Sequence, residues 1–101
     1  MNSSIIIYMQ GENSKQISYT KLLGEIIKSH RKRTNKSIYL ISAESSIAKS
    51  SWRELELGLR KDINLSTFCK IAEGINIPPH KLLKELSEKL GKDFSFTDIE
   101  I

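Results

Sequence analysis

The sequence predicts a small all-α domain made of five helices. Apolar residues recur at spacings of three and four between residues 18 and 91, which is the period of a helix that buries one face. Serine or asparagine precedes several of these segments, and glycine or asparagine follows them, as expected for helix caps. With 101 residues, of which 39% are hydrophobic, the chain can build one core and one domain.

The first helix is expected to run from Ser18 or Thr20, either of which can cap it, to about Arg33. Asn35 should end it, because asparagine is second only to glycine in adopting the left-handed conformation. The apolar stripe of this helix consists of Leu22, Leu23, Ile26, Ile27 and His30.

Two short helices should follow, joined by a tight turn. Ser37 can cap the first of them, which is expected to reach Glu44, and residues 45–47 should form the turn. The second is expected over residues 49–57. Two short helices joined by a turn of about three or four residues have the spacing of a helix-turn-helix.

The helix expected over 49–57 is the element around which the rest is organised. Trp52 and Leu55 are three residues apart and therefore share its buried face, and Gly58 can stop it. A helix this short is not stable alone in water, so other helices must hold it. Its polar face is then left free to meet a partner.

Two further helices complete the expected bundle. Asn64 can cap a helix that begins at Leu65 and fades between Gly74 and Asn76. Pro79 suits the first turn of the fifth helix, because its missing N–H would be unpaired there anyway, and Gly91 can stop that helix. The residues expected to be buried on these two helices are Leu65, Phe68, Ile71, Ala72, Leu82, Leu83, Leu86 and Leu90.

The two ends of the chain lie outside the expected helical domain of residues 18–91. Residues 1–17 form an N-terminal extension in which Ile5–Met9 is either a short strand or disordered. The tail, residues 92–101, alternates at Phe94–Phe96 and again at Ile99–Ile101, a weak indication of strand. Either end could thus add a short β-element to an otherwise helical fold.

Several classes of protein are excluded by composition. No apolar run approaches the roughly 18 residues of a membrane span, and the single cysteine, Cys69, excludes an intramolecular disulfide framework. We therefore expect a cytoplasmic protein. His30 and His80 are isolated, no residues have metal-ligand spacing, and no glycine loop could bind phosphate. We expect no metal, no cofactor and no enzymatic activity.

The charge of the chain is unevenly distributed. The formal net charge is +4, yet residues 21–61 carry ten basic and four acidic residues, while residues 62–101 carry five basic and seven acidic ones. The positive charge thus coincides with the expected helix-turn-helix, as in a surface that faces phosphates. An ordinary solvated face is the alternative explanation.

About two-thirds of the chain, from Leu22 to Leu86, resembles the lambda-repressor-like, Cro-type helix-turn-helix family. The resemblance implies a five-helix bundle in which the helix over 49–57 enters the major groove of DNA. The residues that carry it are Leu23-Gly24, Arg31, Ser37, Ile47-Ala48-Lys49-Ser50, Leu55-Glu56 with Gly58, Leu65, Phe68, Lys70-Ile71-Ala72, Ile75, Ile77 and Leu82-Leu83.

The resemblance also implies roles for individual residues. The side chains implied to contact bases are Lys49, Ser50 and Glu54. Those implied to contact the DNA backbone are Ser37, Ser51, Arg53, Arg60 and Lys61. Arg31 and Glu56 match positions that in many relatives form a partly buried ion pair, which would fix the angle of the recognition helix.

The sequence departs from the family pattern in two places. Ile38 stands where relatives often carry a glutamine that binds a phosphate, and residues 38–41 are four consecutive apolar residues that cannot all face one core. We expect a shift of helix register that buries them; the alternative is an exposed apolar patch that binds a protein. His30 replaces an aliphatic residue, and we expect a core histidine bonded to backbone.

The function that the resemblance implies is a sequence-specific DNA-binding transcriptional regulator. It would act as a homodimer on a pseudo-palindromic operator with half-sites roughly 10 bp apart. The alternatives are an antitoxin or adaptor that uses the fold to bind a protein, and a DNA-binding protein with little sequence preference. The apolar residues available for self-association outside the bundle are Ile5, Ile6, Ile7, Phe94, Phe96, Ile99 and Ile101.

Overall fold

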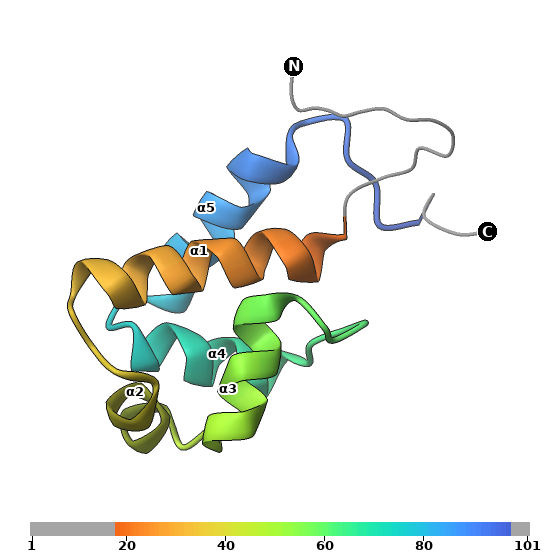
Figure 1. Ribbon diagram of the computed structural model, residues 1–101. Helices are drawn as coiled ribbons and strands as arrows, with labels where there is room; N and C mark the ends of the chain where they lie inside the picture. The colour runs from red at the N-terminus through yellow and green to blue at the C-terminus, as the bar shows by residue number, and fades with distance from the viewer. Residues whose placement is uncertain (1–17, 98–101) are drawn as a thin grey trace.

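The computed structural model describes residues 18–97, and these residues form the expected five helices. In chain order the helices are α1 (Tyr19–Arg33), α2 (Ile38–Ser45), α3 (Lys49–Leu57), α4 (Leu65–Gly74) and α5 (Pro79–Leu90). Helix α1 lies between α5 on one side and α3 on the other (Figure 1), while α4 packs against both α2 and α5. The all-α class is thereby confirmed.

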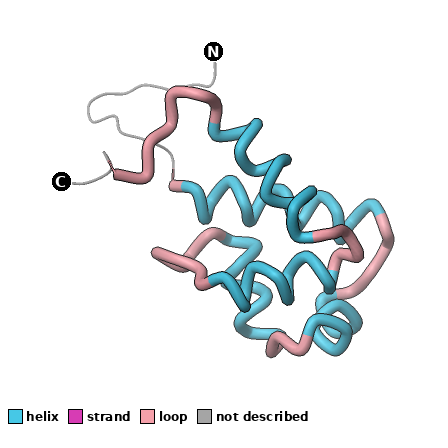
Figure 2. Tube along the Cα trace, turned by 180° about the vertical axis from the view of Figure 1, so that it is seen from behind, coloured by secondary structure: helices cyan, strands magenta, loops and turns pink. Residues whose placement is uncertain are grey.

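No strand occurs among residues 18–97, and Figure 2 shows only helices and loops there. The strand expected at Phe94–Phe96 is wrong. Instead the ring of Phe96 packs edge-on against Tyr19, with centroids 5.3 Å apart, and against Phe94 at 4.9 Å. Edge-on contacts between aromatic rings, rather than strand pairing, hold this part of the tail. The other two segments with a strand pattern, Ile5–Met9 and Ile99–Ile101, lie outside the described residues.

The helix ends follow the capping residues of the sequence. Ser18 is the N-cap of α1, since its hydroxyl accepts a hydrogen bond from the backbone N–H of Thr20. Thr20 itself is buried, and its hydroxyl donates to the carbonyl of Arg60 at 2.7 Å. Asn35 has φ of 60°, the left-handed conformation expected just after the helix.

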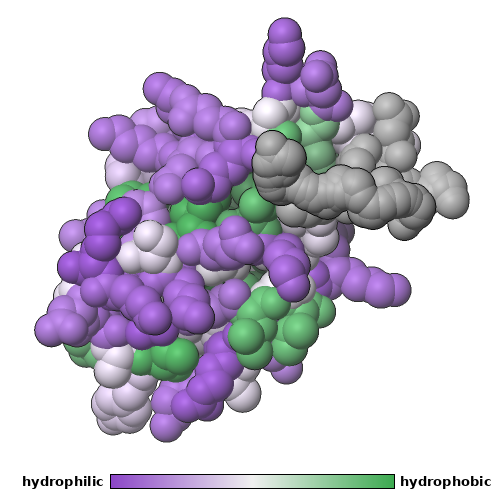
Figure 3. All heavy atoms as spheres, turned by 45° about the horizontal axis from the view of Figure 1, so that its top comes forward, coloured by the Kyte–Doolittle hydropathy of each residue, from purple (hydrophilic) through white to green (hydrophobic). Residues whose placement is uncertain are grey.

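One continuous core holds the five helices together, and all five contribute to it. Trp52 of α3 is its largest fully buried side chain. Around the core, the visible surface is mostly hydrophilic with a few compact hydrophobic patches (Figure 3). The buried apolar residues are Leu23, Ile26, Ile27, Ile41, Ile47, Trp52, Leu55, Ile71, Ala72, Ile75, Leu82 and Leu86.

Two leucines expected in the core are exposed. Leu65 is 77% exposed and Leu83 is 53% exposed. Both lie at the margin of the apolar stripe of their helix, where the packed face gives way to solvent. Residues at the centre of each stripe, such as Ile71 and Leu82, are fully buried as expected.

The expected shift of register in α2 is wrong. Ser37 caps the helix by accepting the N–H of Leu40 at 3.0 Å, so α2 begins at Ile38 without a shift. Ile41 is fully buried, but Tyr39 is 70% exposed and Leu40 is 43% exposed. Four consecutive residues spread around the whole helix, and the core can accept only one side of it.

Close approach of α1 and α3 depends on a glycine. A Cβ atom at Gly24 would lie 2.5 Å from the carbonyl oxygen of Leu55 and 2.6 Å from that of Glu56. Both are backbone atoms and cannot turn away. At the end of α3, Gly58 has φ of 70° and closes the helix in the left-handed conformation. The position of α3 against α1 is therefore set by backbone contact.

Candidate nucleic-acid interface

Helices α2 and α3 are joined by a three-residue turn that is anchored in the core. Ser46 adopts φ of 61° directly after α2 and reverses the chain. Ile47 is 7% exposed, and its backbone groups bond to Ser42: its N–H donates to the carbonyl at 3.3 Å and its carbonyl accepts from the hydroxyl. The turn thus fixes where α3 begins.

Helix α3 has one face in the core and the other in solvent. Trp52 and Leu55 on the inner face are 0% and 2% exposed. Its N-cap, Ala48, offers no side-chain hydrogen bond, so the first N–H groups of the helix are left to solvent or a ligand. These groups carry the positive end of the helix dipole, which favours an anion such as phosphate.

The outer face of α3 presents the side chains that the sequence analysis singled out. Lys49, Ser50, Arg53 and Glu54 are exposed, and Ser51 is half-buried at the edge of the face. Leu57 is 59% exposed on the same helix and was not singled out from the sequence. Its position, two residues after Leu55, could have indicated an outward-facing apolar group.

Lys49 does not extend freely from the start of α3. Its Nζ lies over the ring of Tyr39 of α2, 5.3 Å from the centroid, which is within the range of a cation–π contact. The exposed tyrosine therefore borders the outer face of α3. This contact was not anticipated from the sequence, which predicted either burial of residues 38–41 or an exposed apolar patch there.

Glu54 and Arg60 are paired with each other. Arg60 Nε lies 3.3 Å from Glu54 Oε1, and the two side chains are 34% and 52% exposed, respectively. Glu54, the implied base contact, and Arg60, the implied backbone contact, are thus neighbours on one surface. Exposed pairs of this kind contribute little to stability, so either group can exchange its partner for a ligand.

The remaining implied backbone contacts, Ser37 and Lys61, lie outside α3 and are exposed. Ser37, at the start of α2, uses its hydroxyl oxygen to cap the helix, yet its O–H remains able to donate. Lys61 is exposed in the loop after α3.

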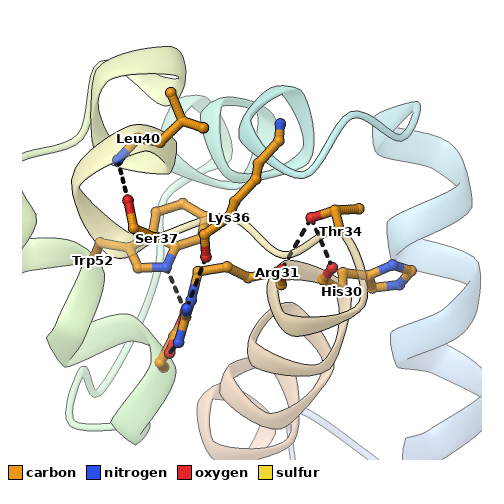
Figure 4. Close-up of polar contacts among 8 residues, drawn as sticks. His30, Arg31, Thr34, Lys36, Ser37, Leu40 and Trp52 are labelled. Atoms are coloured by element: carbon orange, nitrogen blue, oxygen red, sulfur yellow. Dashed lines mark hydrogen bonds and ion pairs between the residues drawn. The ribbon is translucent and has the colours of Figure 1, made fainter.

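Behind α3, the side chain of Arg31 of α1 extends toward Trp52 of α3 (Figure 4), and its guanidinium forms a two-point ion pair with Glu56. Arg31 Nε lies 2.5 Å from Glu56 Oε2 and Nη2 lies 3.0 Å from Oε1. The side chains are 14% and 6% exposed. These contacts with Glu56 raise the pKa of the Arg31 guanidinium above its ordinary value. The pair joins α1 directly to the inner side of α3.

Two further hydrogen bonds complete this network and were not anticipated from the sequence. The indole N–H of Trp52 donates to Glu56 Oε2 at 2.6 Å, and Arg31 Nη1 donates to the carbonyl of Lys36 at 3.0 Å. Trp52 and Glu56 are four residues apart on one helix, so the spacing itself allows the first contact. The network therefore links α1, the loop before α2, and α3.

The imidazole of His30 was expected to bond to backbone, but it bonds to two side chains instead. Its Nε2 lies 2.9 Å from Glu85 of α5, and its Nδ1 lies 2.8 Å from Arg33. Arginine can only donate, so Nδ1 accepts and Nε2 carries the proton that is donated to the carboxylate. The histidine therefore bridges α1 and α5 at the rim of the core.

The described part of the chain contains neither a metal-ligand cluster nor a membrane-spanning helix. Residues 18–97 contain no cluster of three or more His, Cys, Asp or Glu side chains arranged to hold a metal ion. Cys69, expected to be a small core residue, is a half-buried free thiol. None of the five described helices has the length and hydrophobicity needed to span a bilayer.

Five helices in this order, with α2 and α3 joined by a tight turn and α3 seated against α1, define the lambda-repressor-like helix-turn-helix fold. Solved structures agree with this assignment. The restriction-modification controller protein C.AhdI from Aeromonas hydrophila is 21% identical, with 65% of this chain and 98% of that one covered, at a TM-score of 0.59. ClgR, the clp gene regulator from C. glutamicum, is 14% identical, with 77% and 100% covered, at 0.66.

SinR, a master regulator for biofilm formation, has been solved both with DNA and with the protein SinI. The DNA complex matches at 24% identity, with 60% of this chain and 97% of that one covered, at a TM-score of 0.55. The SinI complex matches at 25% identity, with 70% and 69% covered, at 0.57. No protein-family model and no curated protein matches the sequence. The likeness establishes the fold.

Proposed function

We propose that this protein is a sequence-specific DNA-binding transcriptional regulator whose helix α3 enters the major groove. The observation that carries the proposal is the two-sided character of α3. Its inner face is held by the core and by the ion pair between Arg31 and Glu56. On its outer face, Lys49, Ser50, Arg53 and Glu54 are exposed to solvent. In a helix-turn-helix fold this helix is the one that can enter the major groove. SinR, which has the same fold, was solved in complex with DNA.

The proposed division of labour follows from side-chain chemistry. Lys49 can donate to guanine O6 and N7, Glu54 can accept from the amino group of cytosine, and Ser50 can do either. Ser37, Ser51, Arg53, Arg60 and Lys61 are proposed to bind phosphates. A single small module makes few base contacts, so we propose a homodimer on a pseudo-palindromic operator with half-sites roughly 10 bp apart.

The decisive experiment is selection of bound sequences from a random pool of duplex DNA. The expected result is an enriched site with two related halves, and affinity that falls steeply with salt, by about 0.9 in log–log slope for each phosphate contact. No affinity at low salt would overturn the proposal. Affinity without enrichment would reduce it to DNA binding of low specificity.

Variants of the outer face can separate base contacts from phosphate contacts. Lys49→Ala and Glu54→Ala should change which sequences are enriched, whereas Lys61→Ala should weaken all sequences alike and lower the salt slope by about 1. Lys61 is the better phosphate variant, because Arg60 is bonded to Glu54 and its removal would disturb both groups. Unchanged enrichment for Lys49→Ala would remove it from the set of base contacts.

A second function is favoured by one specific observation, the exposed apolar side chains of α2. Tyr39 and Leu40 are 70% and 43% exposed, and a contiguous exposed apolar patch is typical of a protein-binding surface. An antitoxin or adaptor would use them to bind a protein, as SinR is seen in complex with SinI. Co-purification of a partner that Tyr39→Ala releases, with no DNA binding by the wild type, would favour this function.

A further inference from the structure

An apolar groove of about 280 Å³ lies between the start of α1, the start of α4 and one side of α5. The residues that line it are Tyr19, Ile63, Leu65, Phe68, Leu83, Leu86 and Phe96.

The groove gathers several exposed apolar side chains in one place. Leu65, Leu83 and Phe96 are 77%, 53% and 59% exposed. They account for three of the seven large hydrophobic side chains exposed among residues 18–97. Two of them are the leucines whose periodicity predicted burial. Covering them would remove apolar surface from water, which is favourable in proportion to the area.

The groove is also firmly built. Tyr19 lines it, and its hydroxyl both donates to Asp62 and accepts from the N–H of Ile63 at 2.8 Å. Phe96 closes one side by packing on Tyr19. Tyr19, Ile63 and Phe68 also pack against the core, so this part of the groove has a defined shape.

We propose that the occupant is the apolar segment Ile5–Met9 of the same chain. This segment, Ile-Ile-Ile-Tyr-Met, is the longest run of large apolar residues in the seventeen that precede Ser18. The described chain begins beside the groove, because Tyr19, the first residue of α1, is one of its walls. The residues that precede the described chain are therefore joined to it beside this exposed apolar surface.

The length of the intervening chain is sufficient. Nine residue steps separate Met9 from Ser18, and an extended chain covers at most roughly 3.3–3.6 Å per residue, so the segment can reach any part of a groove that borders Tyr19. The connection, Gln10 to Ile17, contains Gly11 and polar residues suited to a turn. A second copy of the chain is the competing occupant, and the experiment below distinguishes the two.

Disulfide trapping in the full chain tests this proposal directly. In a Cys69→Ser background, Ile6→Cys is combined with Leu83→Cys, whose side chain faces the groove and is exposed enough to be replaced without unfolding. The matched control combines Ile6→Cys with Lys81→Cys, an exposed residue on the other side of α5. Near-ultraviolet circular dichroism of both variants checks that the fold is retained.

The expected result is an intramolecular disulfide that forms about tenfold faster in the Leu83 pair than in the Lys81 pair, because docking raises the effective concentration of the two thiols. Its rate should not depend on protein concentration. Equal rates for the two pairs would overturn the proposal. A disulfide-linked dimer whose yield rises with concentration would overturn it in favour of a second copy. Neither outcome depends on whether the protein binds DNA.

Discussion

Removal of the guanidinium of Arg31 is the sharpest test of how α3 is held. Arg31→Met keeps most of the apolar stem but removes two of the three hydrogen bonds that Glu56 accepts. The carboxylate is then left 6% exposed with the indole of Trp52 as its remaining donor. Breaking a buried ion pair costs about 3–5 kcal/mol. Arg31 is 14% exposed, so water compensates in part, and we expect about 2–3 kcal/mol.

The measurement is urea unfolding followed by the fluorescence of Trp52. It is the single tryptophan of the chain, is fully buried, and belongs to the network itself. For a domain this small, m is about 1 kcal/mol/M, so the midpoint should fall by about 2–3 M. Lys32→Met, an exposed residue beside Arg31, should stay within about 0.5 kcal/mol of the wild type.

A second substitution tests whether the unpaired buried carboxylate of Glu56 causes the loss of stability. Combining Arg31→Met with Glu56→Gln removes the unpaired carboxylate but keeps an acceptor for Trp52, so most of the lost stability should return. The reasoning would be refuted if Arg31→Met costs less than about 0.5 kcal/mol, or if the double variant is no more stable than the single one. If the double variant regains its stability but binds DNA more weakly than the wild type, the ion pair also orients α3.

Three further predictions follow from other contacts. Gly24→Ala should lower stability by about 2–3 kcal/mol despite the better helix propensity of alanine, because its Cβ would lie 2.5 Å from the carbonyl of Leu55; Ser29→Ala, exposed on the same helix, is the control in thermal unfolding. Burial, followed by the hydrogen bond to Asp62, raises the pKa of Tyr19 from 10.0 to about 12. The stability that this phenol contributes is complete below pH 10 and is lost as pH rises through 12, so the difference between wild type and Tyr19→Phe should disappear over that range in urea titrations. Tyr39→Ala should change the free energy of unfolding by less than about 0.5 kcal/mol, since the ring is 70% exposed; a larger loss would mean that it packs on the core.

The helices could be predicted from the sequence because local chemistry marks their ends. Asn64 caps α4 through its side chain, Pro79 has the fixed φ that suits the first turn of α5, and Gly58 closes α3 in the left-handed conformation. Helix α3 begins and ends at the predicted residues. Burial at the margins of a helix is different, since it depends on how far the neighbouring helices extend. The periodicity that includes Leu65 and Leu83 therefore predicted their helices correctly, but both side chains are exposed in the structure.

The candidate site shows the same limit at the level of single side chains. The residue types and spacing of α3 indicated which groups would share its outer face. They could not indicate that Glu54 would meet Arg60 or that Lys49 would lie over Tyr39. Each of those contacts joins residues that are brought together only when the turns before and after α3 are folded, and six or more positions separate the partners in sequence.

The way in which α3 is fastened leaves its two sides independent of each other. The buried contacts that join α3 to α1 and the core come from Trp52, Leu55 and Glu56 and from the backbone opposite Gly24. Ser50 and Arg53 are exposed, and Lys49 contacts the exposed ring of Tyr39. Substitutions at these outer positions should therefore cost little folding free energy, and under the proposed function they would change which DNA sequences are bound. The residues on the outer face of α3 can be substituted, by evolution or by design, while the bundle that carries the helix stays the same.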